Sequence, residues 1–370
     1  MKWLFLSCHT GEGHNSAARA IIKAAEERGI DCILADPLSF GSEWAERAAS
    51  NTYNSIIQKA PAAFGVVYRA GELFEKTGVT SPVFLANALY AKNLKSYLQA
   101  ERFDAVICTH LYGMEAMTAV RKRLTDTTPC FGVLTDYACI PFFAETELDR
   151  YFIPHADLME ELVDKGMDRE KLLPTGIPVS LEYANPRGKA AARNALVIPE
   201  KRRVYLVMSG GMGSGNLQSI CDSFAQLERA DQTVYVLVGR NDELCEKLRD
   251  RYRKQKSIQI ITFTTQVYLF MEAADVLITK PGGLSSTEAI TLGIPMIHLL
   301  SIPGCETRNA DFFVRHGMSL LAESPLDAVE KAIKLVENPQ QRERMKDNQR
   351  AHAHPDAAKR IVDQVIRYAK

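Results

Sequence analysis

The chain has 370 residues, which is too long for one compact core and suits two domains of roughly 100–200 residues each. Hydrophobic residues make up 46% and charged residues 24%, as in ordinary soluble globular proteins, which excludes a wholly disordered or fibrous chain. Lys+Arg and Asp+Glu balance at 45 each, which leaves no bulk positive field for nucleic acid, and no apolar run approaches the ~18 residues of a membrane-spanning helix.

Short apolar runs alternate with amphipathic stretches through the first half, a pattern that predicts a parallel sheet wrapped by helices. The first run is shorter than the ~7–15 apolar residues of a secretion signal, so it is interpreted as a buried strand. The predicted strands of this half span 3–7, 32–35, 105–109, 130–135 and 150–154, with helices at 16–28 and 114–123.

Residues 51–90 interrupt this alternation with many apolar side chains and few charges. The segment is either an inserted helical pair that packs its own small core or an apolar lip that meets a lipid or a membrane surface. The sequence leaves both interpretations open.

A Pro- and Gly-rich break at 174–178 and 185–188 precedes a second alternating series. We therefore expect an α/β protein of two doubly wound units, with a ligand cleft between them at the carboxyl ends of the strands. The predicted strands of this half span 204–208, 234–238, 258–261, 276–279 and 296–299, with helices at 217–229 and 242–253.

The turn after the first strand contains Gly11, Gly13 and His14. The glycines allow a tight turn and a close approach of the backbone to a ligand. His14 lies at or next to a helix N-terminus, where the helix dipole lowers the pKa of an imidazole and keeps it neutral, as a general base requires. A histidine that merely caps the helix is the alternative, and the G-x-G-x-x-G pattern of dinucleotide binding is absent.

Two further strand-to-helix turns, in the second half, are typical of phosphate binding. One begins with Ser209, Gly210 and Gly211 and presents backbone N–H groups at a helix start, although a tight packed turn explains it too. The other follows the strand at 276–279 and is rich in glycines and hydroxyls, with Lys280 as a countercharge. Residues 1–185 contain 18 basic and 24 acidic side chains and the remainder 27 and 21, which fits an anionic ligand in the second half or a merely solvated surface.

Glu288 is predicted in the first turn of the helix that this second turn opens. There it either complements the helix dipole or accepts hydrogen bonds from a sugar diol. Two phosphate-type turns and one such carboxylate suggest a single diphosphate-linked ribose.

Eight cysteines without a C-x-x-C pair are typical of buried, reduced thiols in a cytosolic enzyme. His110 follows the strand at 105–109, at the same predicted sheet edge as His14, where it either lines a ligand cleft or belongs to the core. The basic run at 249–256 is typical of a solvated helix face, with anionic lipid headgroups as an alternative partner.

Seven stretches carry a resemblance over nearly the whole chain: TGEGHNSAA at 10–18, VLTDY at 133–137, TGIPV at 175–179, the turn at 208–215, the segments 280–288 and 292–295, and PGCETRN at 303–309. In this order they resemble the inverting glycosyltransferases of the GT-B fold. More narrowly, the chain is similar to the diacylglycerol glycosyltransferases, which include bacterial processive diacylglycerol β-glucosyltransferases and plant monogalactosyldiacylglycerol synthases.

The resemblance implies a UDP-hexose donor in the second domain. Glu288 matches the carboxylate that binds the ribose hydroxyls, the turn at Ser209 matches the diphosphate site, and the backbone near Phe263 matches the uracil site. Glu306 and Asn309 match residues that face the hexose. The full predicted donor set is Ser209, Gly210, Gly211, Thr262, Phe263, Thr264, Lys280, Gly282, Gly283, Ser285, Thr287, Glu288, Glu306, Thr307 and Asn309.

On the acceptor side, the resemblance implies that His14 takes the proton of a diacylglycerol hydroxyl. Asp136 either orients His14 or serves as the base itself. The remaining predicted acceptor-side residues are Gly11, Gly13, His110 and Thr135.

The resemblance also implies an acceptor domain at 1–185, completed by a C-terminal helix at 356–370, and a donor domain at 186–355. UDP-sugar is then a co-substrate, and no metal cofactor is expected because the chain contains no Asp-x-Asp motif. Glucose is favoured over galactose as the hexose. The expected location is cytoplasmic, peripheral on the inner face of the cell membrane of a bacterium.

Three alternatives remain. An N-acetylglucosaminyltransferase acting on a polyprenyl-linked peptidoglycan precursor shares the fold, but Cys305 and Glu306 stand where that family has two glutamines. A UDP-sugar epimerase would give the apolar segment at 51–90 no purpose. A non-catalytic UDP-sugar-binding regulator is disfavoured by the intact residues His14, Asp136 and Glu288.

Overall fold

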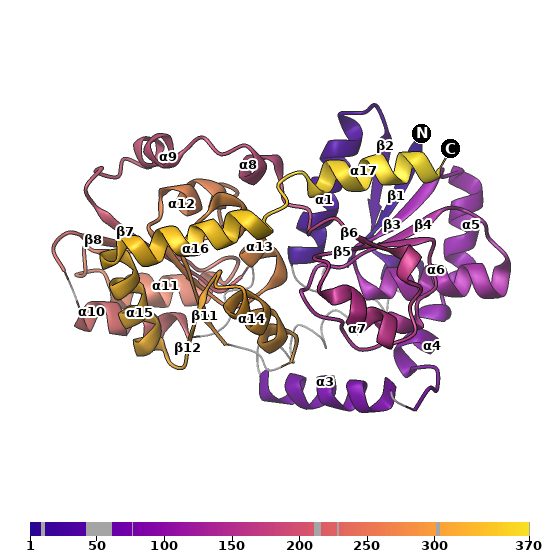
Figure 1. Ribbon diagram of the computed structural model, residues 1–370, viewed down its shortest axis with the longest axis horizontal. Helices are drawn as coiled ribbons and strands as arrows, with labels where there is room; N and C mark the ends of the chain where they lie inside the picture. The colour runs from indigo at the N-terminus through magenta and orange to yellow at the C-terminus, as the bar shows by residue number, and fades with distance from the viewer. Residues whose placement is uncertain are drawn as a thin grey trace. The chain divides into compact units, whose positions relative to one another are not determined.

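The computed structural model describes residues 1–8, 12–41, 61–75, 77–210, 216–227, 229–300 and 304–369, with the side chains of helix α3 described from Tyr68 onward. The chain forms two compact units, Met1–Ser180 with His354–Lys370, and Leu181–Ala353. It therefore passes between units after Ser180 and after Ala353, rather than at the expected positions 185 and 355. Each unit contains a six-stranded parallel sheet flanked by helices, which confirms the predicted α/β fold of two doubly wound units (Figure 1).

The sheet of the N-terminal unit has the strand order β2-β1-β3-β4-β5-β6. Its strands are β1 (Lys2–Leu6), β2 (Asp31–Ala35), β3 (Ala105–Cys108), β4 (Cys130–Val133), β5 (Arg150–Ile153) and β6 (Leu172–Pro174). The helices are α1 (Glu12–Glu26), α3 (Pro61–Glu75), α4 (Pro82–Ala88), α5 (Ala91–Glu101), α6 (Leu111–Leu124), α7 (Leu158–Asp164) and α17 (Ala357–Tyr368), with 3₁₀ turns at Pro37–Phe40, Phe143–Glu145 and Arg169–Lys171.

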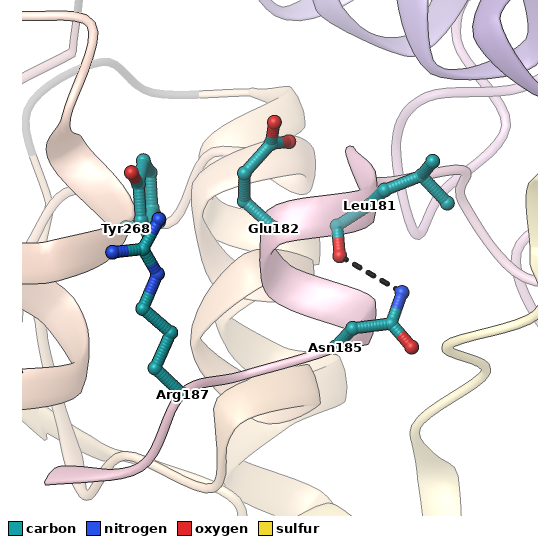
Figure 2. Close-up of a pocket in the computed structure, with 5 residues that line it drawn as sticks. All are labelled: Leu181, Glu182, Asn185, Arg187 and Tyr268. Atoms are coloured by element: carbon teal, nitrogen blue, oxygen red, sulfur yellow. Dashed lines mark hydrogen bonds between the residues drawn. The ribbon is translucent and has the colours of Figure 1, made fainter. Parts of the chain in front are cut away.

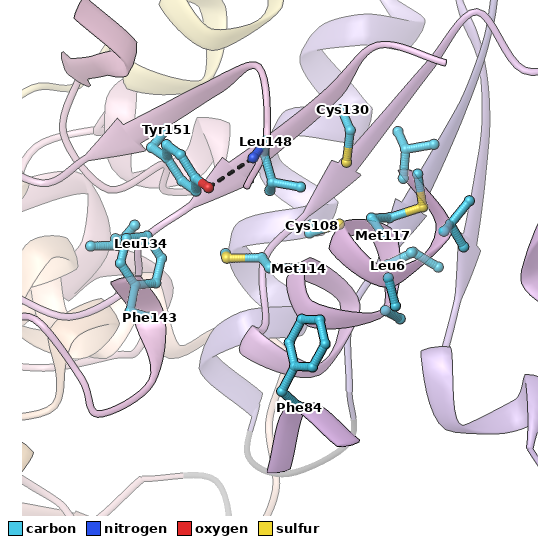
Figure 3. Close-up of a cluster of buried hydrophobic side chains, with 14 of the residues drawn as sticks. Leu6, Phe84, Cys108, Met114, Met117, Cys130, Leu134, Phe143, Leu148 and Tyr151 are labelled. Atoms are coloured by element: carbon cyan, nitrogen blue, oxygen red, sulfur yellow. Dashed lines mark hydrogen bonds between the residues drawn. The ribbon is translucent and has the colours of Figure 1, made fainter. Parts of the chain in front are cut away.

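Helices cover both faces of this sheet, so both faces are buried. Successive side chains of a strand point to opposite faces and therefore enter two different cores. Trp3 and Phe5 of β1 pack with apolar side chains of α1 and α17. Leu4 and Leu6 belong to a second core, which α4, α5 and α6 complete on the other face (Figure 3). The continuous apolar run at the start of the chain is thus explained by a central strand covered on both sides.

Helix α17 completes the N-terminal unit by packing beside α1 (Figure 1). Ile361 and Val365 of α17 are fully buried. Just before this helix, His354 lies against Gly176, which has a φ of +90°. A Cβ atom at Gly176 would lie 2.5 Å from the Cβ of His354, so this approach of the chain to the end of β6 requires glycine.

The sheet of the C-terminal unit has the strand order β12-β11-β10-β7-β8-β9. Its strands are β7 (Arg203–Met208), β8 (Gln232–Leu237), β9 (Ile258–Ile261), β10 (Val276–Thr279), β11 (Met296–Leu299) and β12 (Leu320–Ala322). The helices are α8 (Leu181–Ala184), α9 (Lys189–Ala195), α10 (Leu217–Gln226), α11 (Asp242–Arg251), α12 (Val267–Ala273), α13 (Gly283–Leu292), α14 (Cys305–Arg315), α15 (Pro325–Glu337) and α16 (Pro339–His352).

Two strands, β6 and β12, were not predicted. Each has only three residues and lies at a sheet edge. β6 ends in Pro174, within the segment interpreted as a break, because proline is compatible with an edge strand and with a linker alike.

The apolar segment at 51–90 is described in part. Residues 51–60 lie outside the described residues, and α3 and α4 account for much of the rest. Within the described ranges, no helix has both the length and the apolar character needed to cross a membrane.

Candidate active site

His14 lies in the first turn of α1, directly beyond the carboxyl end of β1. Its Nδ1 lies 2.8 Å from the carbonyl oxygen of Thr109 and 2.9 Å from the hydroxyl of Thr135, which follow β3 and β4. Because a carbonyl oxygen can only accept, Nδ1 carries the ring proton. The other ring nitrogen, Nε2, therefore holds the lone pair with which a base accepts a proton.

The environment of His14 keeps this imidazole neutral. Burial lowers its pKa below the ordinary value, and the charge of Asp136 and the hydrogen bond to Thr109 oppose the shift only in part. Asp136 thus lies close enough to act on His14 electrostatically. The structure brings together the three predicted residues His14, Thr135 and Asp136 at one edge of the sheet.

His110 lies at the same edge, as expected from its place after β3. Its ring is perpendicular to that of His14, with 4.6 Å between the ring centroids. His110 is the N-cap of α6, and its Nδ1 accepts a hydrogen bond from the backbone N–H of Tyr112. Its proton is therefore on Nε2, the tautomer opposite to that of His14. Burial, and after it the neighbouring His14, lower the pKa of His110 well below its usual value.

Gly13 is half-buried in the first turn of α1. Gly11 lies outside the described residues, so its predicted part in the acceptor site stays a prediction.

The predicted diphosphate turn starts at the carboxyl end of β7. Ser209 and Thr279, at the ends of the paired strands β7 and β10, have buried hydroxyl groups with no hydrogen-bond partner among the described residues. Gly210 has a φ of +82°, and a Cβ atom there would lie 3.1 Å from the Cε of Lys280. Buried hydroxyls beside a lysine can donate hydrogen bonds to an anionic oxygen. Gly211 lies outside the described residues.

The second predicted phosphate turn leads into α13, whose N-cap is Gly282. A Cβ atom at Gly282 would meet no atom within 4 Å, so this backbone is open to a ligand. The N–H groups of Gly283 and Ser285 belong to the first turn, where they lack partners within the helix. The hydroxyl of Thr287 donates to the carbonyl of Gly283 at 2.7 Å, inside the helix.

Glu288 is the sixth residue of α13 and so lies in its second turn. The prediction that Glu288 lies in the first helical turn was wrong. The helix already begins at Gly283, so the first helical turn ends before Glu288. Glu288 is half-buried, and burial, which disfavours the charged form, raises the pKa of its carboxyl to about 8. The phenol of Tyr183, on the neighbouring helix α8, counteracts part of this rise in the pKa.

Glu306 of α14 is buried and forms an ion pair with Lys280 at 2.8 Å. Asn309, one turn further on, is fully buried and donates to the carbonyl of Pro281 at 3.1 Å. Both side chains thus fasten the start of α14 to the turn before α13. Thr307 is half-buried on the same helix.

Residues 262–264 form the turn between β9 and α12. Thr262 and Thr264 are half-buried, and the hydroxyl of Thr264 accepts from the N–H of Gln266. Phe263 is 47% exposed, and the guanidinium of Arg240 lies 4.6 Å from the centroid of its ring. Arg240 comes just after β8, so this stacked pair occupies the carboxyl edge of the sheet that the donor residues also occupy.

The sequence did not reveal two groups that act on the predicted site residues. The carbonyl of Thr109 binds His14, and Tyr183 affects the pKa of Glu288. A backbone oxygen leaves no signal in a motif, and Tyr183 stands in a segment interpreted only as a linker. A pocket of about 260 Å³ is lined by residues of the same segment and of α12, which Figure 2 shows: Leu181, Glu182, Asn185, Arg187 and Tyr268. Over the described ranges, no group of three or more His, Cys, Asp or Glu side chains is arranged to hold a metal ion.

Two family models match the chain one after the other. Residues 14–179 match the monogalactosyldiacylglycerol (MGDG) synthase family, and residues 188–352 match the glycosyl transferases group 1 family. The chain is also 25% identical to the processive diacylglycerol beta-glucosyltransferase of Bacillus cytotoxicus over 99% of its own length and 93% of that protein. The Bacillus cereus AH187 protein of the same name is 26% identical over the same shares.

Solved structures share the fold. The MurG structure of Acinetobacter baumannii superposes with a TM-score of 0.65 at 15% identity, covering 99% of both chains. The S. aureus MnaA–UDP structure superposes with a TM-score of 0.66 at 14% identity, covering 99% of this chain and 96% of that one. Because the sequence identity is low, this likeness shows the fold alone, which is the two-domain GT-B architecture.

Proposed function

Because the chain belongs to the diacylglycerol glycosyltransferases, we propose that it transfers a hexose from a UDP-sugar to 1,2-diacylglycerol, with inversion, to form a β-linked glycolipid. The observation that carries this proposal is the match over 99% of the chain to processive diacylglycerol beta-glucosyltransferases, together with the neutral, oriented His14. The same relatives favour glucose over galactose as the hexose.

The acceptor chemistry would take place at Nε2 of His14. The diacylglycerol hydroxyl attacks the anomeric carbon of the donor and loses its proton to this nitrogen, while the bond from that carbon to the UDP oxygen breaks. Asp136 then stabilises the imidazolium that forms, which agrees with its effect on the pKa of His14. Attack from the face opposite the leaving UDP gives the β product from an α-linked donor.

The donor chemistry would take place in the C-terminal unit. Negative charge grows on the diphosphate as UDP departs, and Lys280, Ser209 and the first turn of α13 supply fixed positive charge and hydrogen-bond donors. Such preorganised donors stabilise a transition state by several kcal/mol. Glu288 would accept hydrogen bonds from the ribose diol, and Glu306 and Asn309 would border the hexose.

The acceptor lies in a lipid bilayer, so the enzyme must meet a membrane, and we place it on the inner face. Helix α4 and its C-cap Leu89 carry an exposed apolar stripe at helical spacing, made of Pro82, Leu85, Ala86 and Leu89. Leu85 is 50% exposed and Leu89 85%, and no residue from 77 to 91 is charged. A stripe of this kind is suited to shallow insertion between lipid headgroups.

The test is an assay of the purified protein with diacylglycerol vesicles, a metal chelator, and either UDP-glucose or UDP-galactose. We expect UDP release and a glycolipid with one donor, in the presence of chelator, and a β linkage in the product by NMR. Parallel reactions contain UDP-N-acetylglucosamine, with a polyprenyl-linked peptidoglycan precursor or without acceptor. Turnover only in these would favour the peptidoglycan transferase or the epimerase instead, and UDP binding without any turnover would favour the regulator.

A further inference from the structure

The loop between β4 and β5, residues 134–149, packs against helix α3. Gly71 of α3 lies so close to it that a Cβ atom there would lie 3.2 Å from the Cβ of Pro141 and 3.3 Å from the Cζ of Phe142. Phe74, also on α3, meets the ring of Phe142 edge-on, with 6.3 Å between the ring centroids. Helix α3 is thus fastened to the β4–β5 loop at Phe142.

The same loop holds the start of helix α4. The carboxylate of Glu145 accepts a hydrogen bond from the backbone N–H of Ser81 at 2.9 Å. Ser81 is fully buried and is the N-cap of α4, where its hydroxyl accepts from the N–H of Phe84. The exposed leucines Leu85 and Leu89 follow on this helix, so Glu145 fixes the place at which the apolar stripe begins.

Phe142 has a backbone conformation that is unusual for a bulky residue. Its φ is +68°, in the left-handed region that the Cβ atom disfavours. Such a conformation persists only where the surrounding structure holds it. The half-buried ring of Phe142 is held by α3, so the path of the β4–β5 loop depends on the position of that helix.

The β4–β5 loop leads from these contacts to the predicted acceptor residues. Directly after β4 it contains Thr135, whose hydroxyl contacts the proposed base, and Asp136. The chain between Asp136 and Phe142 is packed rather than open, because Tyr137 is 7% exposed and Cys139 is 1% exposed. Since close-packed segments transmit a displacement, a shift of Phe142 is expected to reach Thr135 and Asp136.

We propose that Phe142 and Glu145 are positioning residues through which contact of α3 and α4 with a lipid bilayer sets the acceptor side of the active site. Docking of the two helices favours the loop conformation in which Thr135 and Asp136 stand beside His14. The enzyme then works faster on diacylglycerol in a bilayer than on a diacylglycerol in solution. This inference rests on the proposed function, in which α4 meets the bilayer and His14 accepts the proton.

Lipid can favour one loop conformation only if it binds that conformation better. Leu73 of α3 is 65% exposed and Leu85 of α4 is 50% exposed, so both helices offer apolar side chains to a bilayer. The β4–β5 loop ties the two helices together, and linked contacts bind a surface more tightly than separate ones. The bilayer therefore selects the conformation in which the loop holds both helices.

The experiment compares kcat with two acceptors, long-chain diacylglycerol in excess phosphatidylglycerol vesicles and dibutyrylglycerol dissolved in water. A minor conformation is commonly populated to about 10% or less, so wild-type kcat should be at least about tenfold higher with vesicles. Phe142→Gly removes the ring but suits the left-handed backbone. It should bring the ratio of the two kcat values close to one, and leave kcat with dibutyrylglycerol nearly unchanged.

Glu145 offers a matched pair of variants. Glu145→Ala removes the acceptor of the Ser81 N–H and should lower the ratio, whereas Glu145→Gln retains a side-chain oxygen and should keep the wild-type ratio. Phe40→Gly is the control for loss of an aromatic ring, because the half-buried Phe40 packs on Tyr97 of α5 instead. It should also keep the wild-type ratio.

Packing alone predicts other results. An equal loss of kcat with both acceptors in Phe142→Gly would overturn the inference, as would equal ratios in Glu145→Ala and Glu145→Gln. A wild-type ratio of one would overturn it as well, while transfer to diacylglycerol would still stand. If the wild-type enzyme transfers no hexose to either acceptor, the proposed function is wrong and the inference falls with it.

Discussion

The carbonyl oxygen of Thr109 lies 2.8 Å from Nδ1 of His14 and so determines which nitrogen of the ring carries the proton. Thr109 follows β3 and His14 follows β1, and these two strands are hydrogen-bonded neighbours in the sheet. The fold itself thus orients the imidazole that we propose as the base, through a backbone carbonyl at the end of the neighbouring strand. The negative charge of Asp136 acts on the same ring by raising its pKa.

His14→Ala should lower kcat for glycosyl transfer by 10²–10⁴-fold, the usual contribution of a positioned general base. UDP binding should remain, because the predicted donor residues belong to the other unit. Kinetics with saturating diacylglycerol and calorimetry with UDP measure the two separately. Near-normal kcat in His14→Ala would move the role of base to Asp136.

Asp136→Asn should shift the acidic limb of the pH–rate profile. The base is active when neutral, so activity is lost as pH falls through the pKa of His14, which burial places below its ordinary value. The charge of Asp136 raises that pKa, and its removal should move the limb to still lower pH while kcat decreases. A limb that moves upward, or stays in place, would contradict this electrostatic role.

His110→Asn should impair use of diacylglycerol rather than of the donor. Asparagine is a good N-cap, so α6 should keep its cap while the ring beside His14 is lost. We expect the KM for diacylglycerol to rise about tenfold, as for loss of one or two contacts of about 1 kcal/mol, with an unchanged UDP affinity. Steady-state kinetics with each substrate varied in turn checks both values, and a selective rise in the donor KM would refute the assignment.

Lys280→Met should reduce kcat/KM for the UDP-sugar about 10²-fold, the usual effect of removing one stabilising donor from a developing anion. It also leaves Glu306 without its cation, so Lys280→Met is combined with Glu306→Gln in a double-mutant cycle. Lys331→Met breaks an ion pair with Asp327 on α15, at a lysine of similar exposure, and should have no effect on turnover. Recovery of activity in the double variant would mean that Lys280 serves only to neutralise Glu306.

The sequence was sufficient to predict those features of the site that depend only on where the strands end and in which order they pair. The ends of β1, β3 and β4 could be located from apolar runs, and parallel pairing then brings His14, His110 and Thr135 to one edge. The glycines that open the phosphate turns were equally visible, because open backbone requires that residue type.

Features that depend on tertiary contact were not accessible in this way. Tyr183 acts on the pKa of Glu288 from α8, which packs on α13, and nothing in the intervening sequence indicates that the two helices pack together. The register of α13 was misjudged for a related reason, since four small residues, Gly282, Gly283, Ser285 and Ser286, fit a turn and a helix start equally well. Thr287 appeared available to a ligand, although its hydroxyl bonds to Gly283.

Charge substitutions on α4 should separate membrane binding from catalysis. Leu85→Glu and Leu89→Glu place carboxylates on the exposed apolar stripe, and each leucine that inserts into a bilayer contributes about 1.5–3 kcal/mol. We expect each variant to bind vesicles of phosphatidylglycerol and diacylglycerol roughly 10- to 100-fold more weakly in a sedimentation assay, and to retain UDP affinity. Leu326→Glu, at an exposed leucine of the C-terminal unit, is the control and should sediment like the wild type. Equal sedimentation of all variants would show that another surface of the enzyme meets the lipid.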